Sequence, residues 1–285
     1  MTDAPAPDTL PADQVELEDI ELDLLTEGIW RRFGIDFRNY SRASLMRRVR
    51  AVVATEGAGT VTGLLAQVLR DRACLDRLLF HLSIHVTTMF RDPSFFLAFR
   101  NEVLPAMRTH PFIRIWHAGC ATGEEVYSMA ILLTEAGLYD RSRIYATDMN
   151  AVVVEKAKAG IFAADRIEEF ERNYQNAGGQ GQFKSWFTSQ YDHAIFKSQL
   201  RRNIVFSPHN LAVDRSFNAF NLILCRNVLI YFNSTLQTAV HTLLHDSLQR
   251  FGYLVLGRGE SLLGTPLETA YERVDKQESI FRRRA

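Results

Sequence analysis

A change in hydrophobic pattern near residue 90 constrains this chain more than any other sequence feature. Before it, apolar residues recur at helical spacing from about Val15 to Leu82, with no alternating run among them. A small helical domain is expected there. After it, short apolar runs at 113–117 and 143–146 each end in a turn and are followed by a segment with the pattern of a helix. Strand, turn and helix repeated in this way predict a parallel doubly wound sheet of the α/β class.

The pattern continues along the chain with one interruption. The expected elements are helices at 126–133, 152–159 and 234–249, and strands at 203–206, 220–225 and 253–257. Between about residues 161 and 202 the alternation lapses into a polar, glycine-rich segment and two short β-type runs. Because both flanks belong to the same sheet, we interpret this stretch as a small β-subdomain inserted in it.

These patterns divide the chain into segments. The prolines among small and acidic residues at 1–13 predict a disordered tail. Gly57 to Thr60 is expected to separate two helices of the helical domain. The expected organisation is a tail at 1–13, a helical domain at 14–84, a linker at 85–99 that contributes to the ligand site, and the sheet domain at 100–285.

The charges are balanced in total but not in order. The chain has 33 basic and 33 acidic side chains, which argues against a general nucleic-acid binder, since such proteins carry a basic excess. From Asp3 to Glu27 there are acidic residues and no Lys or Arg, whereas seven arginines follow between Arg31 and Arg50, opposed only by Asp36. Block patterning of this kind often marks a surface that binds a partner.

The three cysteines and the amino terminus bear on the compartment. Cys74, Cys120 and Cys225 are far apart and lack metal-ligand spacing, so we expect neither a disulfide framework nor a metal site. The amino terminus has no signal-peptide pattern, and no apolar run is long enough to cross a bilayer. We expect a cytoplasmic protein without membrane insertion.

Two turns of the predicted sheet favour a ligand that contains adenosine. The turn from Ala118 to Glu125 follows the first strand, and its small residues, Gly119 among them, allow a ligand to approach the backbone. Asp148 ends the second strand, where an acid often accepts hydrogen bonds from ribose hydroxyls. An ordinary turn and a helix cap are the structural alternatives for these two features. The glycine spacing does not match GxGxxG, which favours S-adenosylmethionine over a dinucleotide.

Two further stretches place polar groups where a ligand is expected. Arg91 and Thr87 lie at the junction of the two predicted domains and offer a guanidinium group and a hydroxyl, while Asp92 is expected to cap a helix that begins at Pro93. At 221–232 an apolar strand runs into Arg226 and Asn227. For Arg226 a purely structural role is the alternative.

Several segments in this order resemble one family. They are TTMFRDPSFF, IWHAGCATGEEVYSMAI, IYATDMN, EKAKAGIF, FSPHNL, FNLILCRNVLIYF and GYLVLGRGES, and the resemblance extends from about Glu27 to Phe281. The chain is similar to chemotaxis receptor methyltransferases of the CheR family. This resemblance implies an all-helical domain that recognises the receptor, followed by a Rossmann-like S-adenosylmethionine methyltransferase domain with an inserted antiparallel β-subdomain at about 161–202.

The resemblance also implies an activity and its residues. The implied reaction is protein-glutamate O-methylation, in which a methyl group passes from S-adenosylmethionine to glutamates on the cytoplasmic helices of chemoreceptors and leaves S-adenosylhomocysteine. Arg91 and Tyr231 correspond to the catalytic positions. The cofactor positions are His85, Thr87, Arg91, Ala118, Gly119, Glu125, Asp148, Asn210, Leu211, Asn227 and Val228.

Some positions depart from the family pattern. His85 stands where Asn is usual, Met89 replaces Phe, and Asn221 replaces Asp. Arg258 and Gly259 replace a His-Ser pair. None of these changes removes a group on which the implied chemistry depends.

The basic block gives the implied partner a place to bind. A predicted helix carries Arg42, Arg47 and Arg50. Their positive charge would guide this helix to the acidic helices of a chemoreceptor. We therefore expect recruitment to receptor arrays, and the short SQYDHA loop favours action without a receptor tether peptide. The alternatives are a non-catalytic scaffold of the same fold that senses the cofactor, and a methyltransferase for another protein.

Overall fold

The chain forms two compact units, residues 1–82 and 83–285. A computed structural model describes residues 12–82, 87–275 and 277–285. The prediction for the tail falls largely on residues 1–11 and so lies outside the described residues. The two units are described separately.

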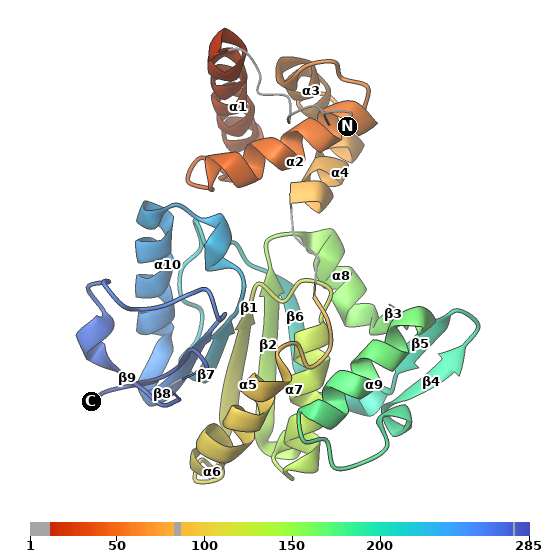
Figure 1. Ribbon diagram of the computed structural model, residues 1–285, viewed down its shortest axis with the longest axis vertical. Coiled ribbons are helices and arrows are strands. Elements are labelled where there is room, and N and C mark those ends of the chain that lie inside the picture. The colour runs from red at the N-terminus through yellow and green to blue at the C-terminus, as the bar shows by residue number, and fades with distance from the viewer. Residues whose placement is uncertain (1–11, 83–86, 276) are drawn as a thin grey trace, which may run out of the picture. The chain divides into compact units, whose positions relative to one another are not determined.

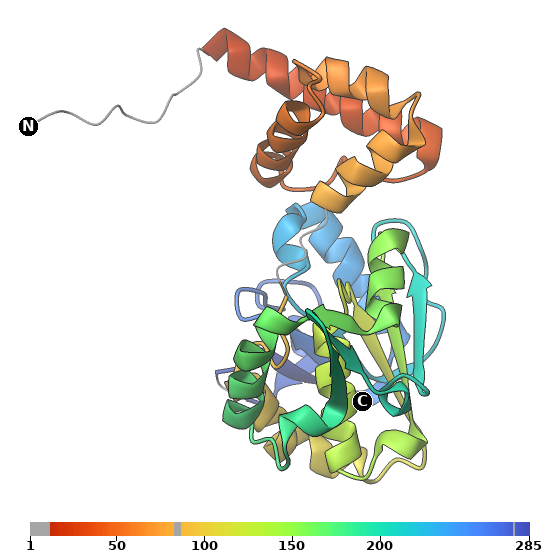
Figure 2. The same ribbon diagram turned by 90° about the vertical axis from the view of Figure 1, so that its right-hand side faces the viewer.

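The first unit is a set of helices, coloured red to orange in Figure 1 and Figure 2. They are α1 (Ala12–Phe33), α2 (Arg42–Thr55), α3 (Val61–Val68) and α4 (Arg72–Leu82). The predicted break between two helices is confirmed, because α2 ends before Gly57 and Thr60 caps α3 by accepting the Gly63 N–H at 2.9 Å. At Gly28 an added Cβ would lie 2.7 Å from the Leu65 side chain, so α1 and α3 pack closely there.

The second unit contains a mixed sheet of seven strands in the order β6-β2-β1-β7-β8-β10-β9 (Figure 1). The strands are β1 (Ile113–Ala118), β2 (Ser142–Asp148), β6 (Ile204–Pro208), β7 (Phe220–Cys225), β8 (Leu248–Leu256), β9 (Tyr271–Arg273) and β10 (Ile280–Arg283). The first five of these are parallel, as predicted, and β9 and β10 add an antiparallel edge that the pattern did not predict. Since β1 lies between β2 and β7, the strand order reverses beside it, where open α/β sheets bind ligands.

Helices on the sheet complete the α/β architecture that the sequence predicts. They are α5 (Pro93–Ala98), a π-helical turn (Phe99–Val103), α6 (Leu104–Met107), α7 (Glu124–Glu135), α8 (Ala151–Ala159) and α10 (Ser234–Ser247). Short 3-10 turns lie at Tyr139–Arg141, Ala164–Arg166, Phe183–Trp186, Ser198–Leu200, Leu229–Tyr231 and Glu268–Ala270. Every helix in the part of the chain that the structure describes is too short or too polar to cross a membrane.

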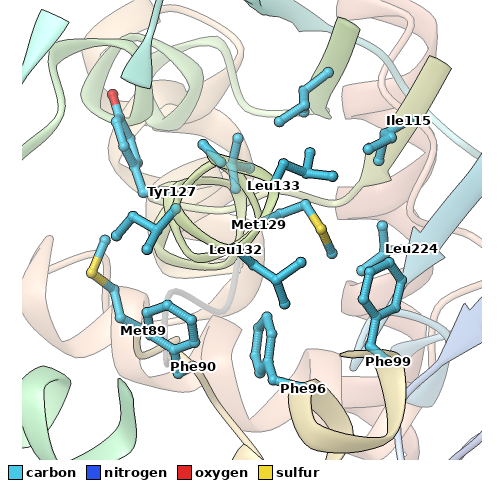
Figure 3. Packing of buried hydrophobic residues seen from close by; sticks show 14 of the residues in the cluster. Met89, Phe90, Phe96, Phe99, Ile115, Tyr127, Met129, Leu132, Leu133 and Leu224 are labelled. Carbon is cyan, nitrogen blue, oxygen red and sulfur yellow. The ribbon is translucent and has the colours of Figure 1, made fainter. Parts of the chain in front are cut away.

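The core of this unit surrounds α7. From Val126 to Leu133 every residue of this helix is buried, so it is covered on all sides rather than on one face. Figure 3 shows its side chains among aromatic residues of the segment that precedes the sheet and apolar residues of the strands. The labelled residues are Met89, Phe90, Phe96, Phe99, Ile115, Tyr127, Met129, Leu132, Leu133 and Leu224. This packing fixes the amino end of α7 relative to the strand ends.

The inserted subdomain is a small antiparallel sheet with one helix. Its strands are β3 (Ile161–Ala163), β4 (Phe187–Gln190) and β5 (His193–Phe196), in the order β3-β5-β4. The helix α9 (Ile167–Asn176) was not predicted. It has three apolar residues, Ile167, Phe170 and Tyr174, and its other residues are polar. Aromatic rings fill the space between α9, this sheet and α7, including Tyr127, Phe162, Phe170 and Phe196.

The aromatic core generates a stability prediction. Phe96→Ala should lower the free energy of unfolding by about 3 to 5 kcal/mol, because it removes a fully buried ring and leaves a cavity. Leu97→Ala is the matched control, because Leu97 is the next residue of the same helix and is 41% exposed. It should cost less than about 1 kcal/mol. Urea unfolding of the two variants measures both effects, and equal losses would contradict this description of the core.

Candidate active site

The candidate site lies at the carboxyl ends of β1, β2 and β7, which are neighbours in the sheet (Figure 1). Three loops leave the sheet there, and each carries residues that the resemblance marks for cofactor binding. They begin at Ala118, Asp148 and Arg226. Because parallel strands end at the same edge, residues from distant parts of the sequence meet at this place.

The loop after β1 is held by the end of β2. The N–H groups of Gly119 and Cys120 both donate to the Thr147 carbonyl at 2.8 Å. The Asp148 carboxylate accepts the N–H of Ala121 at 3.1 Å. Burial raises the pKa of Asp148, and the backbone hydrogen bonds that it accepts act in the opposite direction. The end of β2 therefore holds the loop through three backbone N–H groups of the loop.

The alternative role considered for Asp148, a helix cap, is wrong. The residue that caps α8 is Asn150, whose side chain accepts the Val152 N–H at 3.0 Å. The second oxygen of Asp148 accepts the Asn150 N–H at 3.1 Å. Asp148 thus organises the turn between β2 and α8 and the loop after β1 together.

Gly119 and Val228, both predicted to bind the cofactor, pack against each other. Gly119 has φ of +82°, which favours glycine, and a Cβ there would lie 2.4 Å from Cγ2 of Val228. The loops after β1 and β7 therefore approach more closely than any other residue at position 119 would allow. Ala118, also among the predicted positions, is the buried last residue of β1.

A buried guanidinium group connects three segments beside these loops. Arg226, with its side chain only 2% exposed, donates from Nη1 to Glu125 and from Nη2 to Asp92, each at 2.7 Å. Its guanidinium carbon lies 4.2 Å from the centre of the Phe95 ring. Arg226 therefore has the purely structural role that the sequence analysis left open. It joins the end of β7 to the first turn of α7 and to the segment before α5.

The expectation that Asp92 caps α5 is corrected by this network. Asp92 does precede Pro93, the first residue of the helix, but its side chain makes no capping hydrogen bond. Its carboxylate pairs with Arg226 instead, and its φ of +55° is left-handed rather than extended. A charged partner that lies far away in sequence outweighs the local cap.

Glu125, another predicted cofactor position, has both oxygens engaged within the protein. One accepts from Arg226, and the other lies 3.0 Å from Nδ1 of His117. Burial alone would raise the pKa of Glu125, but the charge of Arg226 and the hydrogen bond with His117 outweigh it and lower the pKa to about 2. Glu125 therefore stays ionised, and its contact with a cofactor remains a prediction.

Glu260 holds the loop after β7 and was missed by the sequence analysis. Its carboxylate, in a residue only 6% exposed, accepts the N–H groups of Asn227 at 2.9 Å, Leu229 at 2.7 Å and Gly257 at 2.6 Å. This fixes the loop that carries Asn227 and Val228. Its sequence signal was its place in the GYLVLGRGES segment that carries the family resemblance, directly after the Arg258-Gly259 pair that departs from the family pattern.

Left-handed backbone is concentrated around the site. Among the residues that the structure describes, six non-glycine residues have positive φ, and four of these lie in the loops after β1 and β7 or in the segment before α5. They are Phe90, Asp92, Ala121 and Asn227, with φ of 51°, 55°, 47° and 60°. Such conformations are costly for residues with a side chain and persist where the surroundings determine them. Arg91, a predicted catalytic residue, lies between two of them.

The remaining predicted positions lie in or near these loops. Asn210 begins the turn after β6, where the His209 N–H donates to the Asp148 carbonyl at 3.0 Å, and Leu211 follows it. Tyr231 ends the 3-10 turn that follows Asn227 and Val228. Thr87 and Arg91 lie in the segment before α5. His85 lies outside the described residues.

The predicted substrate-binding arginines lie on α2, and two of them are paired within the helical unit. Arg42 contacts Asp19 at 3.1 Å and Asp23 at 2.5 Å, and Arg50 contacts Glu18, all three acids being on α1. Arg47 is exposed and forms no ion pair within the residues that the structure describes. The acidic and basic blocks of the sequence thus neutralise each other in part.

The departures from the family pattern have structural partners. Asn221 accepts the Arg114 N–H at 2.8 Å at the start of β7, far along the strand from the site. Met89 is buried in the core. Arg258 pairs with Glu278 at 2.8 Å and also donates to the Ser94 hydroxyl.

Known proteins match both units. Residues 20–83 match the family described as CheR methyltransferase, all-alpha domain, and residues 85–278 match CheR methyltransferase, SAM binding domain. A Pseudomonas putida protein named Cher3 is 47% identical over 265 residues, which cover 93% of this chain and 97% of the relative. A chemotaxis protein methyltransferase of Listeria monocytogenes is 27% identical over 251 residues, 87% of this chain and 93% of the relative. Chemotaxis protein methyltransferase 1 of Vibrio cholerae is 33% identical over 195 residues, 64% of this chain and 67% of the relative.

The pKa of Glu125 generates a prediction about acid stability. Because the folded pKa of about 2 lies below the usual 4.5, the ionised group stabilises the folded chain above pH 4.5, and this contribution is lost as the pH falls through the folded pKa. Glu125→Gln should therefore lower the free energy of unfolding by a few kcal/mol near neutral pH and by progressively less towards pH 2. Urea unfolding across this pH range measures the difference, and a difference that does not change with pH would contradict the assignment.

Proposed function

The chain belongs to the CheR methyltransferase family, as its motifs indicated, and from this premise we propose that it methylates glutamate side chains on the cytoplasmic helices of chemoreceptors. S-adenosylmethionine is the methyl donor. The observation that carries the proposal is the convergence of the Gly119 loop, Asp148 and the Asn227 loop at one edge of the sheet, within the domain that matches the SAM-binding family.

The residues at this edge suit an adenosine-containing cofactor. The Asp148 carboxylate accepts backbone N–H groups of Ala121, Met149 and Asn150. Its two oxygens have about four lone-pair sites, so the carboxylate can also accept a hydrogen bond from a ribose hydroxyl. Gly119 offers backbone where a side chain would collide with Val228. These features support Asp148, Gly119 and Val228 as cofactor-binding residues.

The proposed chemistry asks the protein for orientation rather than for proton transfer. When bound, S-adenosylmethionine supplies a methyl group that is activated by its positively charged sulfur. A glutamate carboxylate has a pKa of about 4.3 and is ionised at neutral pH, so no general base is required. Holding the reacting atoms in line can contribute about 7 to 11 kcal/mol. In this proposal Arg91 orients the substrate carboxylate, and Tyr231 positions the reacting group.

The geometry around Arg91 supports an orienting role. Its neighbours Phe90 and Asp92 both have left-handed backbone, and Asp92 is tied to the buried Arg226. A residue between two such positions has a restricted backbone direction, which limits where its guanidinium group can lie. Guanidinium groups bind carboxylates through two parallel hydrogen bonds, so fixing Arg91 would also fix the plane of the substrate carboxylate.

The helical unit is proposed to recognise the receptor. Arg47 lies exposed on α2 between two arginines that already contact acids of α1. An acidic receptor helix would meet Arg47 without having to displace an internal partner. Complementary charge of this kind raises the rate of encounter and sets orientation.

The transfer reaction tests the proposal. The full chain is incubated with tritiated S-adenosylmethionine and membranes that contain chemoreceptors, and label released by alkali as volatile methanol is counted. Alkali-labile label on the receptor is expected, because glutamate methyl esters hydrolyse under these conditions. Cofactor binding without transfer would instead support the scaffold, and label on another protein would support the second alternative.

Arg91→Ala is expected to lower the rate of transfer by roughly 100-fold or more while the protein stays folded, because it removes the group that orients the substrate carboxylate. The exposed Arg108→Ala is the matched control and should transfer at the normal rate. Initial rates at saturating cofactor, with circular dichroism to verify folding, make the measurement. Near-normal turnover by the Arg91 variant would refute its role.

Arg47→Glu should raise the KM for receptor membranes by about threefold or more through charge repulsion, without changing the affinity for S-adenosylhomocysteine. Arg70→Glu reverses an exposed charge on another part of the helical unit and is the matched control. Steady-state kinetics and calorimetry distinguish the two effects. An unchanged KM for receptor would exclude Arg47 from the docking surface.

A further inference from the structure

The inserted subdomain donates two hydrogen bonds to the segment that carries Arg91. Nη2 of Arg166 donates to the Thr87 carbonyl at 2.7 Å, and Nδ2 of Asn173 donates to the Met89 carbonyl at 3.1 Å. Arg166 ends the 3-10 turn before α9, and Asn173 lies within α9. Both bonds go to backbone oxygens, so the insertion acts on the path of the main chain immediately before Arg91.

Arg166 is itself fixed on several sides. Its Nη1 donates to Glu124 at 3.0 Å, and its guanidinium carbon lies 4.7 Å from the centre of the Phe170 ring. Glu124 is only 2% exposed, and its other oxygen accepts the Thr122 hydroxyl at 2.6 Å. One guanidinium group thus connects the insertion, the start of α7 and the segment before Arg91.

The rest of the unit holds the same segment from the other side. The Phe90 N–H donates to the hydroxyl of Ser128 in α7 at 2.9 Å, and Asp92 pairs with Arg226. Between these anchors the backbone is left-handed at Phe90 and at Asp92. A strained segment keeps one conformation only while its surroundings determine it, so each anchor contributes to the direction in which Arg91 leaves the chain.

We propose that Arg166 and Asn173 are positioning residues through which the inserted subdomain sets the conformation of Thr87 to Arg91 for cofactor binding and methyl transfer. This inference rests on the proposed function of Arg91 and Thr87. Neither residue of the insertion touches the reacting atoms in this proposal. They act through the two backbone carbonyls.

The variants must separate a positioning role of Arg166 and Asn173 from a role in stability alone. Arg166→Ala would leave Glu124 buried without its cationic partner, so loss of activity in that variant could follow from unfolding alone. Arg166→Lys keeps the charge beside Glu124 but not the two-pronged geometry that reaches Thr87. Asn173→Ala removes one neutral hydrogen bond at a partly exposed position. These two variants separate positioning from stability.

The experiment uses the full chain in three variants, Arg166→Lys, Asn173→Ala and the exposed Arg172→Ala of the same helix as the matched control. Circular dichroism and urea unfolding establish that each variant is folded at the assay temperature. Calorimetry with S-adenosylhomocysteine gives cofactor affinity, and transfer to receptor membranes gives kcat and the KM for receptor.

We expect Arg166→Lys to lower kcat by about 10- to 100-fold and Asn173→Ala by about 3- to 10-fold, each with weaker S-adenosylhomocysteine binding and an unchanged KM for receptor. Arg172→Ala should match the unsubstituted chain. Folded variants with normal kcat and normal S-adenosylhomocysteine affinity would overturn the inference. If the unsubstituted chain binds S-adenosylhomocysteine but methylates no receptor, the proposed function fails, and the calorimetric comparison still decides whether the insertion shapes the cofactor site.

Discussion

The candidate site depends on the ion pairs that the buried guanidinium group of Arg226 forms with Asp92 and Glu125. Removing such a charge from water is costly, and two carboxylates and an aromatic face offset the cost only when all of them are in place. Asp92, Glu125 and Arg226 come from three separate segments, so the network forms only in one arrangement of those segments. Its contribution is therefore better understood as geometric specificity than as net stability.

Around this network, the same physical device recurs. A buried carboxylate accepts backbone N–H groups of a loop and so fixes its path without a regular ladder of hydrogen bonds. Asp148 does this for the loop after β1, and Glu260 does it for the loop after β7. In each loop one of the N–H groups so held belongs to a residue with left-handed backbone, Ala121 in the first and Asn227 in the second. The strain and the carboxylates that maintain it are parts of one arrangement.

The sequence predicted the parallel strands and their edge because buried strands are continuous apolar runs that end in small or polar residues. It did not predict α9, in which only Ile167, Phe170 and Tyr174 are apolar, although they have helical spacing. It also did not predict the short strands β9 and β10. Asp92 was misassigned for a related reason. Local patterns reveal a helix cap, whereas its partner Arg226 lies 134 residues away. The strand ends and the domain junction indicated Gly119, Asp148 and Arg91 without any family comparison. Other site residues, such as Glu125, Asn210 and Tyr231, came from the family resemblance, which draws on such distant relations.

The order of charges along the sequence does not by itself give the charge of the folded surface. The sequence suggested an acidic head and a separate basic helix, but α1 and α2 place Asp19 and Asp23 against Arg42 and Glu18 against Arg50. The two pairs of Arg42 are exposed on both sides, and exposed pairs contribute little to stability. In the proposed function, an acidic receptor helix can therefore replace acids of α1 at small cost. The attraction of the helical unit for such a partner then depends on the combined field of both helices, in which Arg47 has the least internal compensation.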